Sequence, residues 1–182
     1  MHRTIRRRRA SALTNYAKRL ALVKSRMDRL VIRKTNRGII AQVVRYSEDG
    51  DKVLAHVNSS ALRQYKWEPK CNIPTAYLTG MLLAKQSKGK VNGKLVLDNG
   101  LYRPIKSGVI FAALRGCVDG GLEVPNSIEF NESRLSGKHI AEFAKNTDKA
   151  KAGHQFSSYE KSKFDVKNIE SIFNEVKKNI KT

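Results

Sequence analysis

Apolar and polar positions between residues 30 and 57 follow the pattern of three short β-strands. Residues 30–34 (LVIRK) form a β-branched run, and residues 38–46 (GIIAQVVRY) are apolar on both faces, which is typical of a central strand. Residues 52–57 (KVLAHV) then alternate between apolar and polar side chains. Short turns rich in Asn, Asp and Gly separate the three segments, so the pattern predicts a three-strand antiparallel meander.

The apolar spacing then changes to that of helices. Asn72 and Pro74 have the residue types of a helix start, and the spacing predicts a helix to about residue 88. A short apolar strand at 95–97 follows, and then a second helix at 107–119, capped by Ser107. A strand reached through a helical crossover favours a parallel neighbour. We therefore predict an α/β fold with a mixed sheet, the meander plus a parallel strand, and packed helices.

The C-terminal part divides into a polar stretch and an amphipathic stretch. Beyond Phe143 the chain is polar and lysine-rich to about Phe164, which predicts a linker or an extended segment. Apolar residues then recur at helical spacing over 165–181, and such a stripe must be buried. The same domain or a neighbouring protein could cover it.

The charge of the chain is large and unevenly distributed. The 182 residues include 36 Lys and Arg and 16 Asp and Glu, a net charge of +20. Residues 1–37 hold 13 of the basic residues and one acid, a net of +12, which leaves +8 for the other 145. A surplus of this size indicates a polyanionic partner, either nucleic acid or an anionic membrane surface.

The densest charge lies in a basic N-terminal arm. Arg3 and the run of residues 6–9 consist of arginine, whose guanidinium bonds phosphate in bidentate fashion, and we expect this run to be disordered until phosphate neutralises it. A localisation signal or a solvated tail is the alternative. Residues 11–25 predict a basic amphipathic helix whose apolar face is narrow and lacks Trp and Phe, which favours RNA over a membrane. The predicted organisation is an arm at 1–28, a core at 29–143, and a linker with a helix at 144–182.

Other classes of protein and site are disfavoured by residues that the sequence lacks. We find no apolar stretch of membrane-spanning length and no apolar segment after the basic run, as a signal peptide requires, so we expect a cytoplasmic protein. Cys71 and Cys117 are in no CxxC pair, so we expect core residues and no bound metal or other cofactor.

Catalysis is disfavoured for a similar reason. The predicted order of strands and helices resembles the ribonuclease H-like topology, whose nucleases hold two metal ions with several carboxylates. Here the first strand carries Arg33 and Lys34, and Asp98 at the end of the fourth strand is interpreted as a turn or capping residue. We therefore expect no enzymatic activity.

Six segments in series resemble one protein family, the large-subunit ribosomal protein family L-eighteen of the archaeal and eukaryotic type. They are TNYAKRLALVKS (14–25), RLVIRKTNRGIIAQVV (29–44), IPTAYLTGMLLAK (73–85), LVLDNGLYRP (95–104), FAALRGCVDGGLEVPNS (111–127) and SGKHIAEFAK (136–145). The resemblance implies a structural constituent of the large ribosomal subunit, with the ribonuclease H-like topology found in proteins of the translation machinery. The short chain favours the archaeal type.

The resemblance also implies partners and contact residues. The ligand would be 5S rRNA, attached to 23S rRNA in the central protuberance beside the L-five family protein and other large-subunit neighbours. The implied RNA-binding residues, together with those chosen from the charge pattern, are Arg3, Arg6, Arg7, Arg8, Arg9, Asn15, Tyr16, Lys18, Arg19, Lys24, Arg33, Lys34, Asn36, Arg37 and Arg103.

Overall fold

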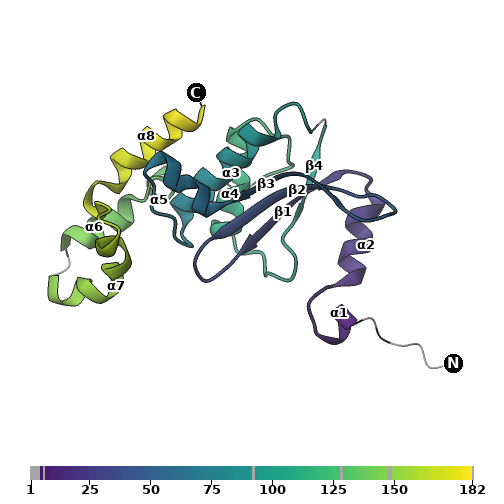
Figure 1. The fold of residues 1–182 in the computed structure, drawn as a ribbon, viewed down its shortest axis with the longest axis horizontal. Coiled ribbons are helices and arrows are strands. Elements are labelled where there is room, and N and C mark those ends of the chain that lie inside the picture. The colour runs from purple at the N-terminus through teal and green to yellow at the C-terminus, as the bar shows by residue number, and fades with distance from the viewer. Residues whose placement is uncertain (1–4, 6, 92, 128, 147–148, 182) are drawn as a thin grey trace.

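The computed structural model describes residue 5 and residues 7–91, 93–127, 129–146 and 149–181, without the side chains of residues 149–154. Figure 1 shows a central sheet with helices packed on it, the N-terminal arm at one end and the C-terminal helices at the other. The elements are α1 Arg7–Ala10, α2 Tyr16–Lys24, β1 Asp28–Lys34, β2 Ile39–Arg45, β3 Lys52–Asn58, η1 Ser59–Tyr65, α3 Ile73–Ser87, β4 Leu95–Asp98, α4 Val109–Asp119, α5 Glu132–Ser136, α6 Lys138–Asn146, α7 Lys149–Lys161, η2 Val166–Asn168 and α8 Ile169–Lys181.

The four strands form one mixed sheet in the order β3-β2-β1-β4. β2 pairs antiparallel with β1 and β3, and β4 pairs parallel with β1, with Leu30 opposite Leu97. The predicted meander with an added parallel strand is thus confirmed. β2 lies inside the sheet, as its apolar residues on both faces predicted.

The hydrophobic core lies between one face of the sheet and helices α3 and α4. Leu30 and Ile32 point into it from β1 and are fully buried. α3 begins at the predicted cap, where the side chain of Asn72 accepts a hydrogen bond from the amide of Thr75. α3 is buried over most of its surface because the sheet, α4 and α8 all contact it.

Helices α3 and α4 contact each other backbone to backbone at two glycines. A Cβ on Gly116 would lie 2.0 Å from the carbonyl oxygen of Tyr77, and one on Gly80 would lie 2.0 Å from that of Ala113. Real Cβ atoms do not approach a backbone oxygen so closely, so any side chain at either position must separate the helices.

We therefore expect Gly116→Ala to lower the free energy of unfolding by about 1–3 kcal/mol, the usual cost of overpacking a core. Urea denaturation would measure it. Gly89→Ala is the control, because a Cβ there meets nothing within 4 Å and only the positive φ of +75° opposes it. That strain costs roughly 1 kcal/mol. Equal losses in the two variants would contradict the close helix contact.

The C-terminal helix α8 packs on the same domain. Its buried side chains Ile169, Phe173, Val176 and Ile180 belong to the same hydrophobic core as the sheet. The ring centroid of Phe173 lies 6.2 Å from that of Trp67 and 5.6 Å from that of Tyr77. The sequence left open whether the apolar stripe at 165–181 packs on the same domain or on a neighbouring protein. The structure shows that it packs on the same domain.

The linker or extended segment expected between Phe143 and Phe164 is wrong for most of the described residues there, which are helical up to Lys161. α6 extends to Asn146 and α7 runs from Lys149 to Lys161. Aromatic contacts hold this segment, with ring centroids of Phe143 and Phe156 5.9 Å apart and those of Tyr159 and Phe164 5.4 Å apart. Four aromatic residues spread through a polar stretch were too few to predict these helices.

Two predicted helix starts also shift. The helix expected from residue 107 begins at Val109, and its cap position is Gly108, without a side-chain hydrogen bond. Ser107 does not cap it, because its backbone is in the left-handed region with φ +56°. In the arm, the helix expected over 11–25 is α2, which begins at Tyr16, because Asn15 caps it by accepting a hydrogen bond from the amide of Lys18.

Candidate nucleic-acid interface

The sheet face opposite α3 and α4 is partly covered by helix α2 of the arm. A groove of about 430 Å³ lies between them, lined by Arg29, Val31 and Arg33 of β1 and by residues of α2, β2 and the loop after β4. None of the residues of α2 is buried. Since apolar burial contributes little here, polar contacts must determine where this helix lies.

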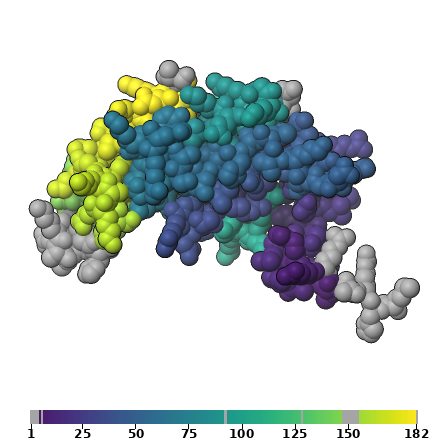
Figure 2. All heavy atoms as spheres, in the orientation of Figure 1, coloured from purple at the N-terminus to yellow at the C-terminus, as the bar shows by residue number. Residues whose placement is uncertain are grey.

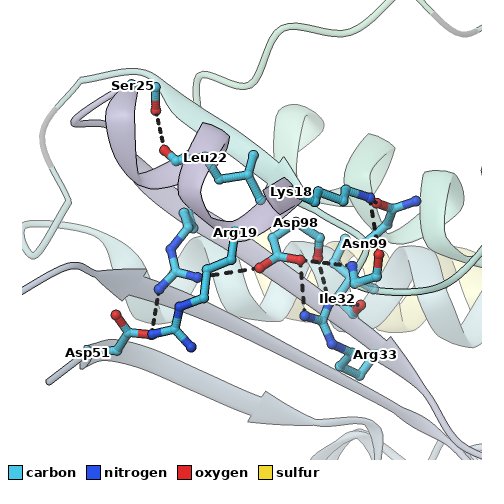
Figure 3. A network of polar contacts seen from close by, with 11 residues as sticks. Lys18, Arg19, Leu22, Ser25, Ile32, Arg33, Asp51, Asp98 and Asn99 are labelled. Atoms are coloured by element: carbon cyan, nitrogen blue, oxygen red, sulfur yellow. Dashed lines mark hydrogen bonds and ion pairs between the residues drawn. The ribbon is translucent and has the colours of Figure 1, made fainter. Parts of the chain in front are cut away.

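A network of polar contacts joins α2 to the sheet (Figure 3). Its centre is Arg29 on β1, which is 4% exposed and forms ion pairs with Asp51 at 2.6 Å and Asp98 at 3.4 Å. Asp51, which directly precedes β3, also accepts a hydrogen bond from Arg19 of α2 at 2.8 Å. One carboxylate thus bridges a buried arginine of the sheet and an exposed arginine of the arm.

The second link between α2 and the sheet runs through the loop after β4. The ammonium group of Lys18 donates hydrogen bonds to the side-chain oxygen of Asn99 and, at 3.1 Å, to the carbonyl of Gly100. Gly100 has φ +60°, and a Cβ there would lie 2.9 Å from the guanidinium carbon of Arg33. This glycine therefore allows the loop to lie against the arginine.

Asp98 joins the loop to β1. It accepts hydrogen bonds from the Arg33 guanidinium at 3.0 Å and from the Gly100 amide at 2.8 Å, so its predicted role as a turn residue is confirmed. Burial alone would raise its pKa, but the charge of Arg33, the Gly100 amide and the charge of Arg29 together hold the pKa below its ordinary value. The carboxylate is therefore ionised at neutral pH.

We expect Asp98→Asn to lower the free energy of unfolding at pH 7 by about 1–3 kcal/mol, because it removes a carboxylate partner from two arginines. A group whose pKa is lower in the folded state stabilises the fold above its unfolded pKa, and this contribution is lost as the pH falls through the folded value. The difference between wild type and variant should therefore shrink as the pH falls below about 4. Urea titrations at pH 7 and at pH 2.5 would measure it. A difference that is the same at both pH values would show that the carboxylate charge contributes nothing.

Exposed basic residues surround this network. They lie on three segments, the arm, the β1–β2 turn and the loop after β4, which hydrogen bonds connect to one another. Lys34 and Arg37 lie in or beside the β1–β2 turn, and Arg103 lies in the loop after β4. The Tyr102 hydroxyl donates a hydrogen bond to the carbonyl of Lys34, and the Lys34 ammonium lies 5.5 Å from the centre of the Tyr102 ring. Lys18 links the same loop to α2. Turn, loop and arm therefore present one continuous basic surface.

The structure divides the predicted RNA-binding residues into two groups. Lys18, Arg19 and Arg33 bond within the protein, and Asn15 caps α2. The second group is exposed, as Arg19 also is, and it consists of Arg7, Arg8, Arg9, Lys24, Lys34, Asn36, Arg37 and Arg103, of which Arg8 also bonds to Thr14. Tyr16 is half-buried at the start of α2. Arg3 and Arg6 lie outside the described residues.

Arg7, Arg8 and Arg9 form the one-turn helix α1. The amide of Ser11 donates to the carbonyl of Arg7, and Arg8 donates a side-chain hydrogen bond to Thr14 at 2.9 Å. Helix α1 lies at the end of the molecule opposite the C-terminal helices (Figure 2).

Sequence reasoning missed the residues that organise this surface, namely Arg29, Asp51 and Tyr102. Arg29 is on the polar side of an alternating strand, and Asp51 is in a turn rich in acidic residues, so each resembles an ordinary surface residue. The alternation of β1 could have placed Arg29 and Arg33 on one face. Only the packing of α2 shows that Arg29 is buried and paired.

The described residues offer no metal site and no membrane span. Within them, no three His, Cys, Asp or Glu side chains gather into a group that could hold a metal ion. None of the described helices has the length and apolar character needed to cross a membrane.

Comparison with known proteins identifies the class. Residues 1–94 match the family described as ribosomal large subunit proteins 60S L5 and 50S L18. The chain is also 41% identical, over 174 residues, to the large ribosomal subunit protein uL18 of Korarchaeum cryptofilum, which covers 93% of this chain and 89% of the relative. This class is that of structural proteins of the large ribosomal subunit. The chain belongs to its uL18 family, as the six segments in the sequence implied.

Proposed function

We propose that this protein binds 5S rRNA and helps to attach it to 23S rRNA in the central protuberance, beside the L-five family protein. Residues 1–28 act as an RNA-binding arm in this proposal, and the core supplies a rigid surface next to it. The observation that carries the proposal is the basic surface formed by the arm, the β1–β2 turn and the loop after β4. Its exposed cations include Arg7, Arg9, Lys34, Arg37 and Arg103.

The chemistry of this surface suits folded RNA. Arginine side chains bond phosphate in bidentate fashion and stack on unpaired bases, and phosphate neutralisation provides most of the affinity. The three segments are tied by hydrogen bonds from Tyr102 and Lys18, so they present their charges in a defined arrangement. A defined arrangement of cations favours recognition of RNA shape over general attraction to polyanions.

The fold supports a structural role rather than nuclease activity. A sheet in the order β3-β2-β1-β4, with β4 parallel to β1, is consistent with a ribonuclease H-like topology. Asp98 stands where such a nuclease would place a metal-binding carboxylate at a strand end. Here Asp98 pairs with Arg29 and Arg33, and two guanidinium groups beside it repel a divalent cation.

The proposal is tested by competition binding to a labelled archaeal 5S rRNA transcript. Unlabelled 5S rRNA should compete far better than tRNA at equal phosphate concentration, in salt near 150 mM. A ternary mixture with the L-five family protein and a 23S rRNA fragment of the central protuberance tests the attachment. Equal competition by tRNA would show that the protein binds RNA without preference for 5S rRNA.

A further inference from the structure

The carboxylate of Asp51 connects the arm to the sheet, and its surroundings are unusual for a surface acid in so basic a chain. It contacts Arg29 at 2.6 Å and Arg19 at 2.8 Å, and its side chain is 24% exposed. Asp49, two residues earlier in the same turn, is exposed as Asp51 is, but it forms no ion pair with another of the described residues. The two acids therefore differ in surroundings while they share a segment and a charge.

Arg29 makes the position of Asp51 rigid. The Arg29 side chain is 5% exposed and is held between Asp51 and Asp98, which is itself bonded to Arg33 and to the Gly100 amide. A buried guanidinium that is paired with two carboxylates has little freedom to move. Breaking either ion pair would leave a buried charge without its partner, which is costly. Asp51 thus presents a fixed acceptor to the arm.

Helix α2 depends on such acceptors for its place. It buries none of its own residues, and its links to the sheet and to the loop after β4 include those of Arg19 to Asp51 and of Lys18 to Asn99 and Gly100. Nine residues are too few for a helix to be stable alone in water. The order of α2 and its orientation therefore follow from these contacts.

From this geometry we infer that Asp51 is a positioning residue of the RNA interface, which holds α2 on the sheet before RNA arrives. The inference rests on the proposed function, since it concerns the same surface. An element that is already ordered loses less conformational entropy on binding, which raises affinity. Asp51 therefore favours RNA binding although its own charge repels phosphate.

Charge alone would predict the opposite effect of a substitution here. Replacing an acid by a neutral residue on a phosphate-binding surface should strengthen binding. Asp51→Asn should instead weaken binding to the 5S rRNA transcript on the order of tenfold, the scale of one charge-assisted hydrogen bond. Asp49→Asn, with the same change of charge in the same turn, should bind as tightly as wild type or slightly tighter. Asp51→Glu should recover most of the affinity, because it keeps the carboxylate.

Hydrogen exchange of the free proteins tests the positioning without RNA. The amides of α2 should exchange faster in Asp51→Asn than in Asp49→Asn, while those of β1 and β2 keep their protection. Arg19→Lys is a second variant that tests the same contact. It keeps the positive charge and leaves the ion pair of Arg29 and Asp51 intact, so the sheet should stay stable. It should also speed exchange in α2.

The outcomes separate this inference from the proposed function. Two results would overturn the inference. The first is hydrogen exchange in α2 that is unchanged in both Asp51→Asn and Arg19→Lys. The second is RNA binding by Asp51→Asn that is as tight as, or tighter than, binding by Asp49→Asn. Both results leave 5S rRNA binding by the wild type untouched. If the wild-type protein showed no preference for 5S rRNA, the proposed function would be contradicted. The hydrogen-exchange measurement would still test whether Asp51 positions α2.

Discussion

Phe173→Ala is expected to lower the free energy of unfolding by about 3–5 kcal/mol, the usual cost of truncating a buried aromatic side chain. Phe173 is 3% exposed, and its ring contacts the rings of Trp67 and Tyr77. Truncation would leave a cavity where α8 meets the N-terminal part of α3, and large neighbouring rings cannot collapse into it. Urea denaturation at pH 7, followed by circular dichroism, would measure the loss.

Phe143→Ala is the matched control for this prediction. Its side chain is 46% exposed on α6, near the same end of the molecule, so its truncation should cost about 1 kcal/mol or less. Similar losses in the two variants would show that α8 does not dock through Phe173. A loss confined to Phe173→Ala would show that the C-terminal helix is part of the domain's cooperative core.

The second large effect concerns the arm and salt. If the protein neutralises about 6–10 phosphates, its affinity for 5S rRNA should fall roughly 10³–10⁵-fold between 50 and 200 mM salt. Replacing Arg7, Arg8 and Arg9 together by Gln should weaken binding at low salt. The slope of log affinity against log salt should become shallower by about 0.9 for each phosphate that the variant no longer neutralises, with duplex nucleic acid as the guide.

A control with the same change of net charge is available at the other end of the molecule. Lys161, Lys163 and Lys167 are exposed and lie in or beside the C-terminal helices. Their replacement by Gln should leave both affinity and slope near those of wild type. Parallel slopes with equal affinities for the two triple variants would mean that the arm does not contact this RNA. In that case Lys34, Arg37 and Arg103 would have to carry the binding.

Local sequence pattern was sufficient for much of the fold. Alternation, turn residues and apolar spacing predicted all four strands and the helices α3 and α4, because each is specified by residues close together in the chain, although only the cap of α3 was predicted correctly. The parallel pairing of β4 was predicted because the strand is reached through a helical crossover, which favours a parallel neighbour. The uneven charge predicted an RNA-binding arm at residues 1–28, which stays a prediction, because electrostatic attraction to RNA depends on the charge itself more than on its exact placement.

The sequence was less informative where one pattern allows several environments. Phe111 belongs to the apolar stripe of α4 and is only half-buried, whereas the neighbouring Ala112 and Ala113 are completely buried. The reason is the close contact of Gly80 with Ala113, which turns the small residues of α4 towards α3. Helix periodicity defines a face, but the neighbouring helix decides which part of that face becomes the core.

The proposed RNA interface shows the same division. The sequence was enough to say which side chains can bind phosphate, since that follows from residue type and from their concentration in the first 37 residues. The packing of distant segments was needed to show that Lys18, Arg19 and Arg33 bond within the protein while Arg37 and Arg103 remain exposed. Their partners Asp51, Asp98 and Asn99 are 32 to 81 residues away in the chain. Contacts over such separations depend on how strands and loops come together, and no local pattern records them.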